Sequence, residues 1–346
     1  MDESGPPASR SASPNRVLVR HLRPAASFAA PRPGLGPPTV PAPRGDDPLR
    51  GVPLILAAVT IFSVSDALAK HLGQFLPPVE VAWMRYATFL LLTLAPILRG
   101  GPAALRSRAP ALQVLRGLAL VGSALSFIFA LRFLPLAEAT AINFVSPVFI
   151  TALSIPFLGE VVGVRRWAAV AVGLAGVLVV VRPGGGAFGA EALLPVLTAA
   201  SWAFAVVVTR KMAGADRPAT TLFWSAAVGF AVLSALLPFS FVAPSAVQVG
   251  LGLLLGIISS AGQWLIVLAY KHAAASVLAP FAYFQLLSSA LLGFLAFGAA
   301  PDGWTLVGAG VIAASGLYTA HRERVRARER AAAAAAAQNR TVSAGT

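Results

Sequence analysis

The sequence predicts an all-α polytopic membrane protein with ten transmembrane helices, arranged as two inverted five-helix repeats. Of the 346 residues, 57% are hydrophobic and only 12% are charged, whereas a soluble domain carries about 25% charged residues. Ten stretches are long and apolar enough to cross a bilayer. The two halves of the chain also resemble each other in sequence. Composition, span count and repeat together predict the fold class.

The ten apolar stretches lie between residues 51 and 319, and each approaches the roughly 20 apolar residues that a membrane crossing requires. Short connections rich in Gly, Pro and charged residues separate them, and none is long enough to hold a soluble domain. We expect one helix for each stretch. The helices are expected to begin near Val52, Pro78, Ala111, Ala137, Trp167, Leu193, Thr220, Val249, Ser276 and Trp304.

Both ends of the chain differ in composition from the apolar region. Residues 1–48 are rich in Pro, Arg and Ser and have no long apolar run, so a disordered tail is expected. Residues 320–346 are expected to form a basic, Ala-rich, helix-prone cytoplasmic tail. The net charge of +14 does not predict a nucleic-acid partner, because thirteen of the 27 basic residues lie before residue 51 or after residue 319.

The positions of Lys and Arg predict the orientation, since cytoplasmic loops carry an excess of both. With the N-terminus inside, the outer connections hold only Lys70, Arg132 and Arg182. The inner connections then hold Arg99, Arg106, Arg108, Arg165, Arg166, Arg210, Lys211, Arg217 and Lys271. We expect both termini in the cytoplasm and the protein in the inner (plasma) membrane.

An internal repeat divides the apolar region into residues 51–182 and 190–319. "ALRFLPLAEATAINFVSPVF" (130–149) aligns with "LAYKHAAASVLAPFAYFQ" (268–285), at a shift of about 138 residues. Each half holds five predicted spans. Because five is odd, the second half must enter the bilayer in the opposite orientation, as in transporters whose binding site lies between inverted repeats.

A longer stretch carries a resemblance to a known family. "LRGLALVGSALSFIFALRFLPLAEATAINFVSPVFITALSIPFLGE" followed by "RRWAAVAVGLAGVLVVVRPGG" resembles the EamA family of the drug/metabolite transporter (DMT) superfamily. The resemblance covers both repeats and is weaker in the second. It implies ten helices around a central cavity, and a carrier, often an exporter, of amino acids, nucleobase-containing metabolites, sugars or drugs.

Two ionisable residues of the first half are expected at membrane depth. Asp66 on the first span and Arg85 on the second lie at similar estimated depths on consecutive antiparallel helices. Charged side chains are costly in hydrocarbon and normally face a cavity or each other. Asp66 and Arg85 are therefore predicted either to line the substrate path or to form a structural ion pair.

The fourth predicted span carries a carboxylate, an amide and a proline near its start. Glu138 lies in the first turn, where the helix dipole favours an anion, or it acts as a protonatable gate. Asn143 lies deeper, and Pro147 removes a backbone donor one turn later. Irregular backbone at this depth is tolerated where it lines a cavity or is buried in protein. Asn143 and Pro147 are predicted to face a cavity, with a packing kink as the alternative.

The second half carries polar and aromatic residues at matching depths. Pro280, Tyr283 and Gln285 lie early in the ninth predicted span, and Gln263 lies at a similar depth in the eighth. Trp202 lies near the middle of the sixth span, where it either lines the cavity or faces lipid. Amides and aromatic rings suit a substrate with a planar or apolar body and a few hydrogen-bonding groups.

Catalytic and metal-binding patterns are not found in the sequence. All four His residues fall in predicted tails or loops, so neither a metal site nor a Ser–His catalytic set is expected, and no cofactor is predicted. There is no Cys and no Walker-type loop. The protein is therefore not expected to be an enzyme. Asp66 and Glu138 are the predicted proton carriers if transport is coupled to a proton gradient.

The sequence thus favours a secondary active transporter that moves a small organic metabolite by alternating access, driven by a gradient or by exchange. The substrate is expected to be amino-acid-like, nucleoside-like or drug-like. A membrane sensor or accessory subunit that shares the fold without transporting is the alternative. The expected partners are the substrate and the lipid bilayer, with a homodimer left open.

Overall fold

The structure is a computed structural model that describes residues 48–99, 101, 105–159, 162–182, 189–212, 214–273 and 275–344. The described residues form helices and contain no strand. The first repeat comprises α1 (Pro48–Leu72), α2 (Pro78–Arg99), α3 (Pro110–Ala130), α4 (Leu136–Asn143), α5 (Ser146–Leu158) and α6 (Val164–Val181). The second comprises η2 (Ala190–Ala192), α7 (Leu193–Lys211), α8 (Pro218–Leu236), η3 (Leu237–Phe239), α9 (Ala246–His272), α10 (Ala275–Ala282), α11 (Phe284–Phe297) and α12 (Gly303–Ala344).

The all-α prediction is confirmed. Within the described residues, eight helical segments are long and apolar enough to cross a membrane. They do not include α2, and α6 offers a shorter apolar stretch, Trp167–Val181. Ten crossings therefore stay a prediction. The predicted disordered tail, apart from Pro48, lies outside the described residues.

The stretches predicted to begin near Ala137 and Ser276 are not single helices, as they were expected to be. Each is broken into two, α4 and α5 in the first repeat and α10 and α11 in the second. Pro147 lies in the first turn of α5, where its missing N–H is not needed. In a continuous helix its ring would clash with the carbonyl of Asn143, so the chain leaves α4 first. Pro280 lies inside α10, and the second break follows within one turn.

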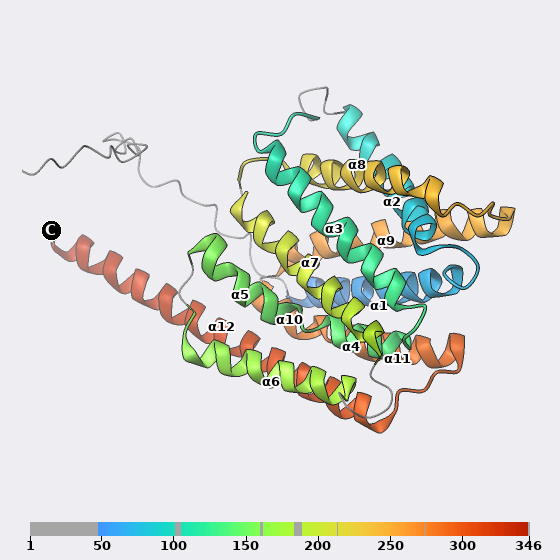
Figure 1. The fold of residues 1–346 in the computed structure, drawn as a ribbon. Coiled ribbons are helices and arrows are strands. Elements are labelled where there is room, and N and C mark those ends of the chain that lie inside the picture. Colours follow the sequence, from blue (N-terminus) through green and yellow to red (C-terminus); the bar gives the residue numbers. More distant parts are fainter. Residues whose placement is uncertain are drawn as a thin grey trace, which may run out of the picture. The chain divides into compact units, whose positions relative to one another are not determined.

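Packing between the repeats is symmetric. α1 of the first repeat packs against α9 of the second. Their equivalents, α7 of the second repeat and α3 of the first, pack against each other in the same way. Likewise α2 packs against α9 and α8 against α3. Two further pairs, α2 with α8 and α6 with α12, each join a helix to its own equivalent (Figure 1). The two repeats are therefore arranged about an approximate two-fold axis that passes between these pairs.

Contacts across the self-equivalent pairs show that equivalent helices run in opposite directions. On α2 and α8, the Trp83 indole N–H donates to Ser234 Oγ at 2.8 Å, whereas Tyr86, later on α2, packs against the earlier Gly229 on α8. Figure 1 shows the same for α1 and α7, which run left to right and right to left respectively. Opposite chain direction is what an inverted repeat requires.

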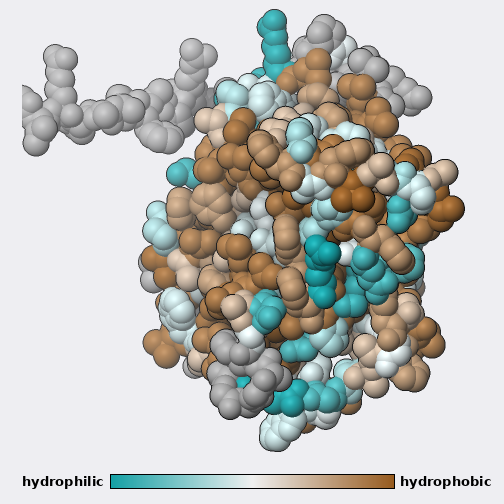
Figure 2. Space-filling model, turned by 45° about the vertical axis from the view of Figure 1, so that its right-hand side comes forward, coloured by the Kyte–Doolittle hydropathy of each residue, from teal (hydrophilic) through white to brown (hydrophobic). Residues whose placement is uncertain are grey.

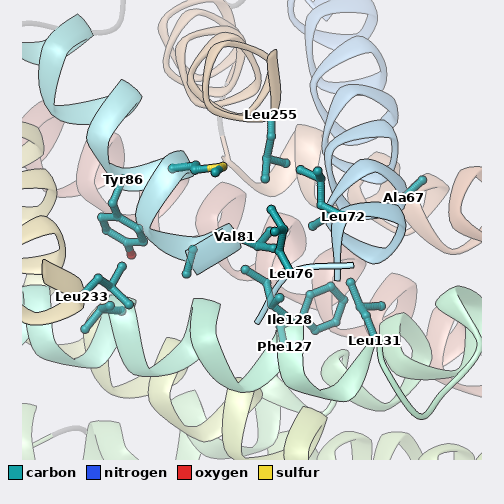
Figure 3. Close-up of a cluster of buried hydrophobic side chains, with 14 of the residues drawn as sticks. Ala67, Leu72, Leu76, Val81, Tyr86, Phe127, Ile128, Leu131, Leu233 and Leu255 are labelled. Carbon is teal, nitrogen blue, oxygen red and sulfur yellow. The ribbon is translucent and has the colours of Figure 1, made fainter. Parts of the chain in front are cut away.

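Buried hydrophobic side chains form three clusters. The largest joins α1, α2, α3, α8 and α9 and includes Leu72, Val81, Ile128, Leu233 and Leu255 (Figure 3). The second lies among α4, α6, α7, α11 and α12, and the third among α1, α9 and α10. All three clusters draw on both repeats, so each repeat completes its core only against the other.

The outer surface of the bundle is largely apolar. Hydrophobic side chains cover much of the face in Figure 2, with polar ones in smaller patches. Large exposed apolar side chains occur on most long helices, and examples are Leu115, Leu178, Leu253, Leu295 and Leu306. A soluble monomer rarely exposes so much contiguous apolar surface. This surface suits contact with lipid.

Glycines bring α9 close to α2. A Cβ added to Gly252 would lie 2.3 Å from Met84 Sδ, and one added to Gly256 would lie 2.3 Å from Thr88 Cβ. Small residues allow such close approach of helices in membranes. The spacing of these two glycines thus serves the contact between α9 of one repeat and α2 of the other.

Replacing Gly256 by Ala should destabilise the bundle, because the added methyl group meets the β-branched Thr88. We expect a loss of about 1–3 kcal/mol, the usual cost of overpacking, measured as a lower unfolding temperature in detergent. Gly250→Ala on the same helix is the control, since nothing lies within 4 Å of its added Cβ. Equal unfolding temperatures for the two variants would contradict this account of the contact.

Candidate functional site

The two helix breaks meet at the interface of the repeats. Phe144 follows α4 and Tyr283 precedes α11, and their rings stack with centroids 5.1 Å apart and an interplanar angle of 30°. The two residues occupy equivalent positions, since their separation in sequence agrees with the repeat shift. A Cβ added to Gly316 on α12 would lie 1.6 Å from the Tyr283 oxygen. Gly316 therefore leaves the space that the tyrosine occupies.

Tight turns close the backbone at each break. The Val145 N–H donates to the Ile142 carbonyl at 3.0 Å, and the Leu286 N–H donates to the Tyr283 carbonyl at 3.0 Å. Beside the first break, Asn143 Oδ1 is buried and accepts no hydrogen bond from a described residue. A buried acceptor without a partner costs about 1–3 kcal/mol. It can be satisfied by a water or by a polar group of a bound molecule.

Serine pairs connect α1 to the second repeat next to this point. Ser63 and Ser288 are joined by a hydrogen bond of 2.9 Å, and Ser65 and Ser259 by one of 2.6 Å. The Ser63 hydroxyl also lies 3.5 Å from the Gln285 carbonyl. These contacts place polar groups of α1, α9 and α11 at one level, beside the α10–α11 break.

Asp66 lies one turn further along α1 and is buried, with 8% of its surface exposed. Arg85 on α2 is half-buried and close enough for its charge to act on the Asp66 carboxylate. However, Asp66 and Arg85 form no ion pair in this structure, so neither charge is neutralised by the other.

Arg116 on α3 is a third ionisable residue at membrane depth, and the sequence argument missed it. Its Nε donates to Thr209 Oγ1 at 2.8 Å, and its Nη1 donates to Ser225 Oγ and, at 3.4 Å, to the Thr221 carbonyl. The residue is half-buried. The sequence alone could have identified Arg116, because it is a charged residue well inside the third apolar stretch, as Arg85 is inside the second.

The other predicted site residues are less closely connected. Tyr283 takes part in the ring stack, and Gln285 contributes its carbonyl beside Ser63. Trp202 is 40% exposed, and neither its indole nor the Gln263 amide hydrogen-bonds to a described residue. Pro147 is exposed and Pro280 is half-buried. Asn143 and Pro147 therefore lie at the first helix break, and Pro280, Tyr283 and Gln285 lie at the second. Phe144 is the partner that the sequence argument did not name.

An open cavity of about 550 Å³ lies at the end of the bundle that the loop charges predict to be outer. Its lining includes Lys70, His71, Gln74, Phe133 and Phe297. The Lys70 ammonium donates to the carbonyls of Leu131 and Leu134 at 2.7 and 2.6 Å and lies 5.6 Å from the Phe297 ring centroid. Lys70 therefore ties the end of α1 to the turn between α3 and α4.

A second contact at the same end joins the two repeats. Arg182, after α6, forms an ion pair with Asp302, which precedes α12 and accepts from the Thr305 N–H at 2.8 Å. The hydrogen bonds from Thr305 lower the pKa of Asp302, with Arg182 adding to them against the effect of burial. Glu138 lies within the electrostatic influence of this pair, in the first turn of α4 as predicted.

At the opposite end, Asp216 in the α7–α8 turn holds the α2–α3 connection. Its carboxylate accepts from the Ser107 hydroxyl, from the Arg108 N–H at 2.8 Å and from the Gln113 amide at 2.7 Å. Burial raises the pKa of Asp216, but these hydrogen bonds and the charge of Arg108 outweigh that effect, so its pKa is lowered. Gln113 also donates to Thr221 Oγ1 at 3.1 Å, which connects this cluster to Arg116.

Comparison with known proteins identifies the family. The chain matches the EamA-like transporter family over residues 49–182 and 190–319. The chain belongs to this family. Both repeats are covered, so this EamA protein has the two-repeat architecture of the family and is a multi-pass membrane protein. Among the described residues, no group of three His, Asp or Glu could hold a metal ion.

Curated relatives of this EamA protein are transporters. It is 31% identical to the riboflavin transporter of Rhizobium johnstonii, over 80% of this chain and 92% of that one. It is 29% identical to the S-adenosylmethionine uptake transporter of Rickettsia prowazekii, over 80% and 94% of the two chains. The pseudopaline exporter CntI of Pseudomonas aeruginosa is 30% identical, over 75% and 91%.

A solved crystal structure shares the fold. It superposes with a TM-score of 0.56 at 23% sequence identity, over 79% of this chain and 98% of the other. At this identity the likeness concerns the fold alone. The names of the relatives agree with the prediction that the protein transports rather than catalyses.

The Asp216 cluster should give the protein a defined acid sensitivity. Because its folded-state pKa is lowered, the carboxylate adds stability above its ordinary pKa of about 3.9, and this stability is lost as the pH falls through the folded-state value. Asp216→Asn should lower the unfolding temperature at neutral pH, and the difference from wild type should shrink below about pH 4. Thermal unfolding in detergent across the pH range measures this difference.

The matched control is Glu191→Gln, which changes an acidic residue of η2 whose side chain makes no hydrogen bond to another described residue. Its unfolding temperature should follow wild type at every pH. A difference between Asp216→Asn and wild type that is constant with pH would show that the carboxylate charge does not stabilise this cluster.

Proposed function

We propose that this protein is a secondary active carrier that moves a small organic metabolite across the inner (plasma) membrane by alternating access. The observation that carries the proposal is the meeting of two equivalent helix breaks, through Phe144 and Tyr283, between repeats of opposite chain direction. Broken helices that meet at a repeat interface are a common way to build a transporter binding site. Family membership and the names of the relatives support it.

Symmetry supplies the mechanism that we propose. Two similar units in opposite orientations can exchange conformations, which closes one face of the bundle and opens the other. The contacts at the two ends are candidates for the alternating closures. The Asp216 cluster closes the predicted inner end, and the Lys70 and Arg182–Asp302 contacts tie helices together at the predicted outer end.

The proposed topology has ten crossings with both termini in the cytoplasm. Eight segments are long and apolar enough by themselves. We assign the ninth crossing to α2, because its 22 residues extend about 33 Å and it is joined to α1 by a short turn. The tenth is α6, which packs antiparallel against α12, as Gly173 lies beside Ser315 and Gly176 beside Ile312.

The proposed substrate path runs from the outer cavity past Asp66 and Arg85 to the helix breaks. Asn143, with its unpaired oxygen, and Tyr283 and Gln285 are proposed to contact the substrate. The proposed path also includes Pro147, Trp202, Gln263 and Pro280. Asp66 is the proposed proton carrier because it is buried without an ion-pair partner, and Glu138 is the second candidate.

Transport is tested with the purified protein in proteoliposomes, screened against amino acids, nucleosides, sugars, riboflavin and S-adenosylmethionine, with uptake and efflux both measured. The last two compounds come from the names of the relatives. The wild type should transport at least one compound above the level of empty liposomes. Absence of any transport would contradict the carrier function and favour a sensor or accessory role.

Arg85→Ala should abolish transport while the protein still inserts into the membrane, because it removes the cation beside Asp66 from the path. The measurement is initial transport rate per inserted protein. Arg132→Ala is the matched control, since Arg132 is exposed in the turn before α4 and should keep the wild-type rate. Unchanged transport in Arg85→Ala would remove this residue from the path.

The proposed orientation predicts the labelling of single cysteines, which the Cys-free chain allows without background. Gln74→Cys, between α1 and α2, should react with a membrane-impermeant maleimide from outside. Arg217→Cys, before α8, should react only after permeabilisation. Labelling of both from the same side would contradict the inverted topology.

A further inference from the structure

Two arginines at membrane depth have no carboxylate partner within ion-pair distance in the described part of the chain. From Arg85, Arg116 and the tyrosine near both of them, Tyr86, we propose an anion-binding subsite that takes the carboxylate or phosphate group of the transported metabolite. The inference rests on the proposed transport function and adds to it the chemical class of the substrate, an organic anion. The subsite is formed by residues of helices α2 and α3.

Arg116 is held through two of its three guanidinium nitrogens and leaves the third without an acceptor among the described residues. Its Nε and Nη1 donate to Thr209, Ser225 and Thr221, all through neutral oxygens. Its Nη2 donates to no described residue and is not among the buried unpaired atoms, so it retains accessible surface. Neutral acceptors orient a guanidinium without cancelling its charge. Nη2 is therefore available to donate a charge-assisted hydrogen bond to a carboxylate or phosphate.

Arg85 reaches the same region from α2. Its guanidinium makes no hydrogen bond with a described residue, and its charge acts on the Asp66 carboxylate of α1. The charges of Arg85 and Arg116 both act on the Tyr86 hydroxyl. Tyr86, the next residue on α2, packs against Gly229 on α8, one helical turn from Ser225, to which Arg116 donates, so the tyrosine lies close to the place where Arg116 is held.

The ring of Tyr86 is held in place by close packing against α8. Only 8% of its surface is exposed, and a Cβ added to Gly229 on α8 would lie 2.2 Å from its Cε1 atom. Figure 3 shows the ring beside Leu233 with its oxygen turned away from α2, toward α3. The hydroxyl donates to no described residue, so its proton is available to an anion.

The net charge of the side chains at membrane depth favours an anionic rather than a neutral substrate. Three charged side chains of the described residues lie more than one helical turn from either end of a crossing segment. They are Asp66, Arg85 and Arg116. Their sum is one positive charge when Asp66 is ionised and two when it is protonated. Isolated charges inside a membrane are costly. A bound carboxylate or phosphate would lower this cost and leave again when the path opens.

The alternative role of Arg116 is a staple that joins α3 to α7 and α8. A staple affects the stability of the bundle and reduces the transport of every compound alike. An anion subsite instead sets a preference between compounds that differ only in charge. The informative measurement is therefore the ratio of transport of an anionic compound to that of its neutral counterpart.

The experiment uses proteoliposomes and three matched pairs: riboflavin 5′-phosphate with riboflavin, nicotinate with nicotinamide, and glutamate with glutamine. In wild type, the anionic member of at least one pair should be transported, or should compete, about tenfold better than its neutral partner. Arg116→Gln should bring that ratio close to one. Arg116→Lys, which keeps the charge, should retain part of the preference, and Arg132→Gln should retain all of it.

Several outcomes would overturn the subsite. These are preference for the neutral members, a preference that survives Arg116→Gln, and an equal fall in transport of both members in that variant. In each case a transported compound is still observed, so the carrier function stands. If wild type transports no compound of either panel, the carrier function and the subsite both fail.

Discussion

A polypeptide in lipid must satisfy its backbone hydrogen bonds internally, and the two helix breaks are the places where this protein departs from a regular helix. Both breaks are covered by protein rather than lipid, because Phe144 and Tyr283 stack on each other and Gly316 admits the tyrosine. The remaining helices shield this junction. The cluster around it and the large cluster on α1–α3 each draw side chains from both repeats, so neither repeat can complete its interior alone.

From this junction, polar groups extend through an otherwise apolar interior toward both ends of the bundle. The serine pairs and Asp66 on α1 lie toward one end, where Lys70 borders an open cavity. Arg116, Gln113 and Asp216 form a connected hydrogen-bond cluster toward the other. Hydrogen bonds or ion pairs thus tie each end, next to buried apolar side chains such as Leu72 and Leu278. Such contacts can break and re-form at a modest cost, which a carrier that opens alternately to both sides requires.

Sequence reasoning located the site better on single helices than between them. Asp66, Arg85 and Asn143 stand out because a polar side chain in an apolar span is visible without any structure. The same reasoning should have found Arg116, whose signal is equally plain. It could not have found the stack of Phe144 on Tyr283, because an aromatic residue in a span is ordinarily core or lipid-facing. It also assumed continuous helices where the chain breaks, since a proline alone does not show at which residue a helix ends.

The sequence by itself determined that the chain is an all-α membrane protein of two related halves, because hydrophobic length and repeat similarity are local properties that survive in any arrangement. Odd span number within each half also implied opposite orientation. Only the tertiary structure decided which polar groups meet. Ser63 with Ser288, Asp216 with Gln113, and Arg116 with Ser225 are pairings between residues that are distant in the chain. They depend on helix rotation and register, which the packing of the two repeats sets and which no single span encodes.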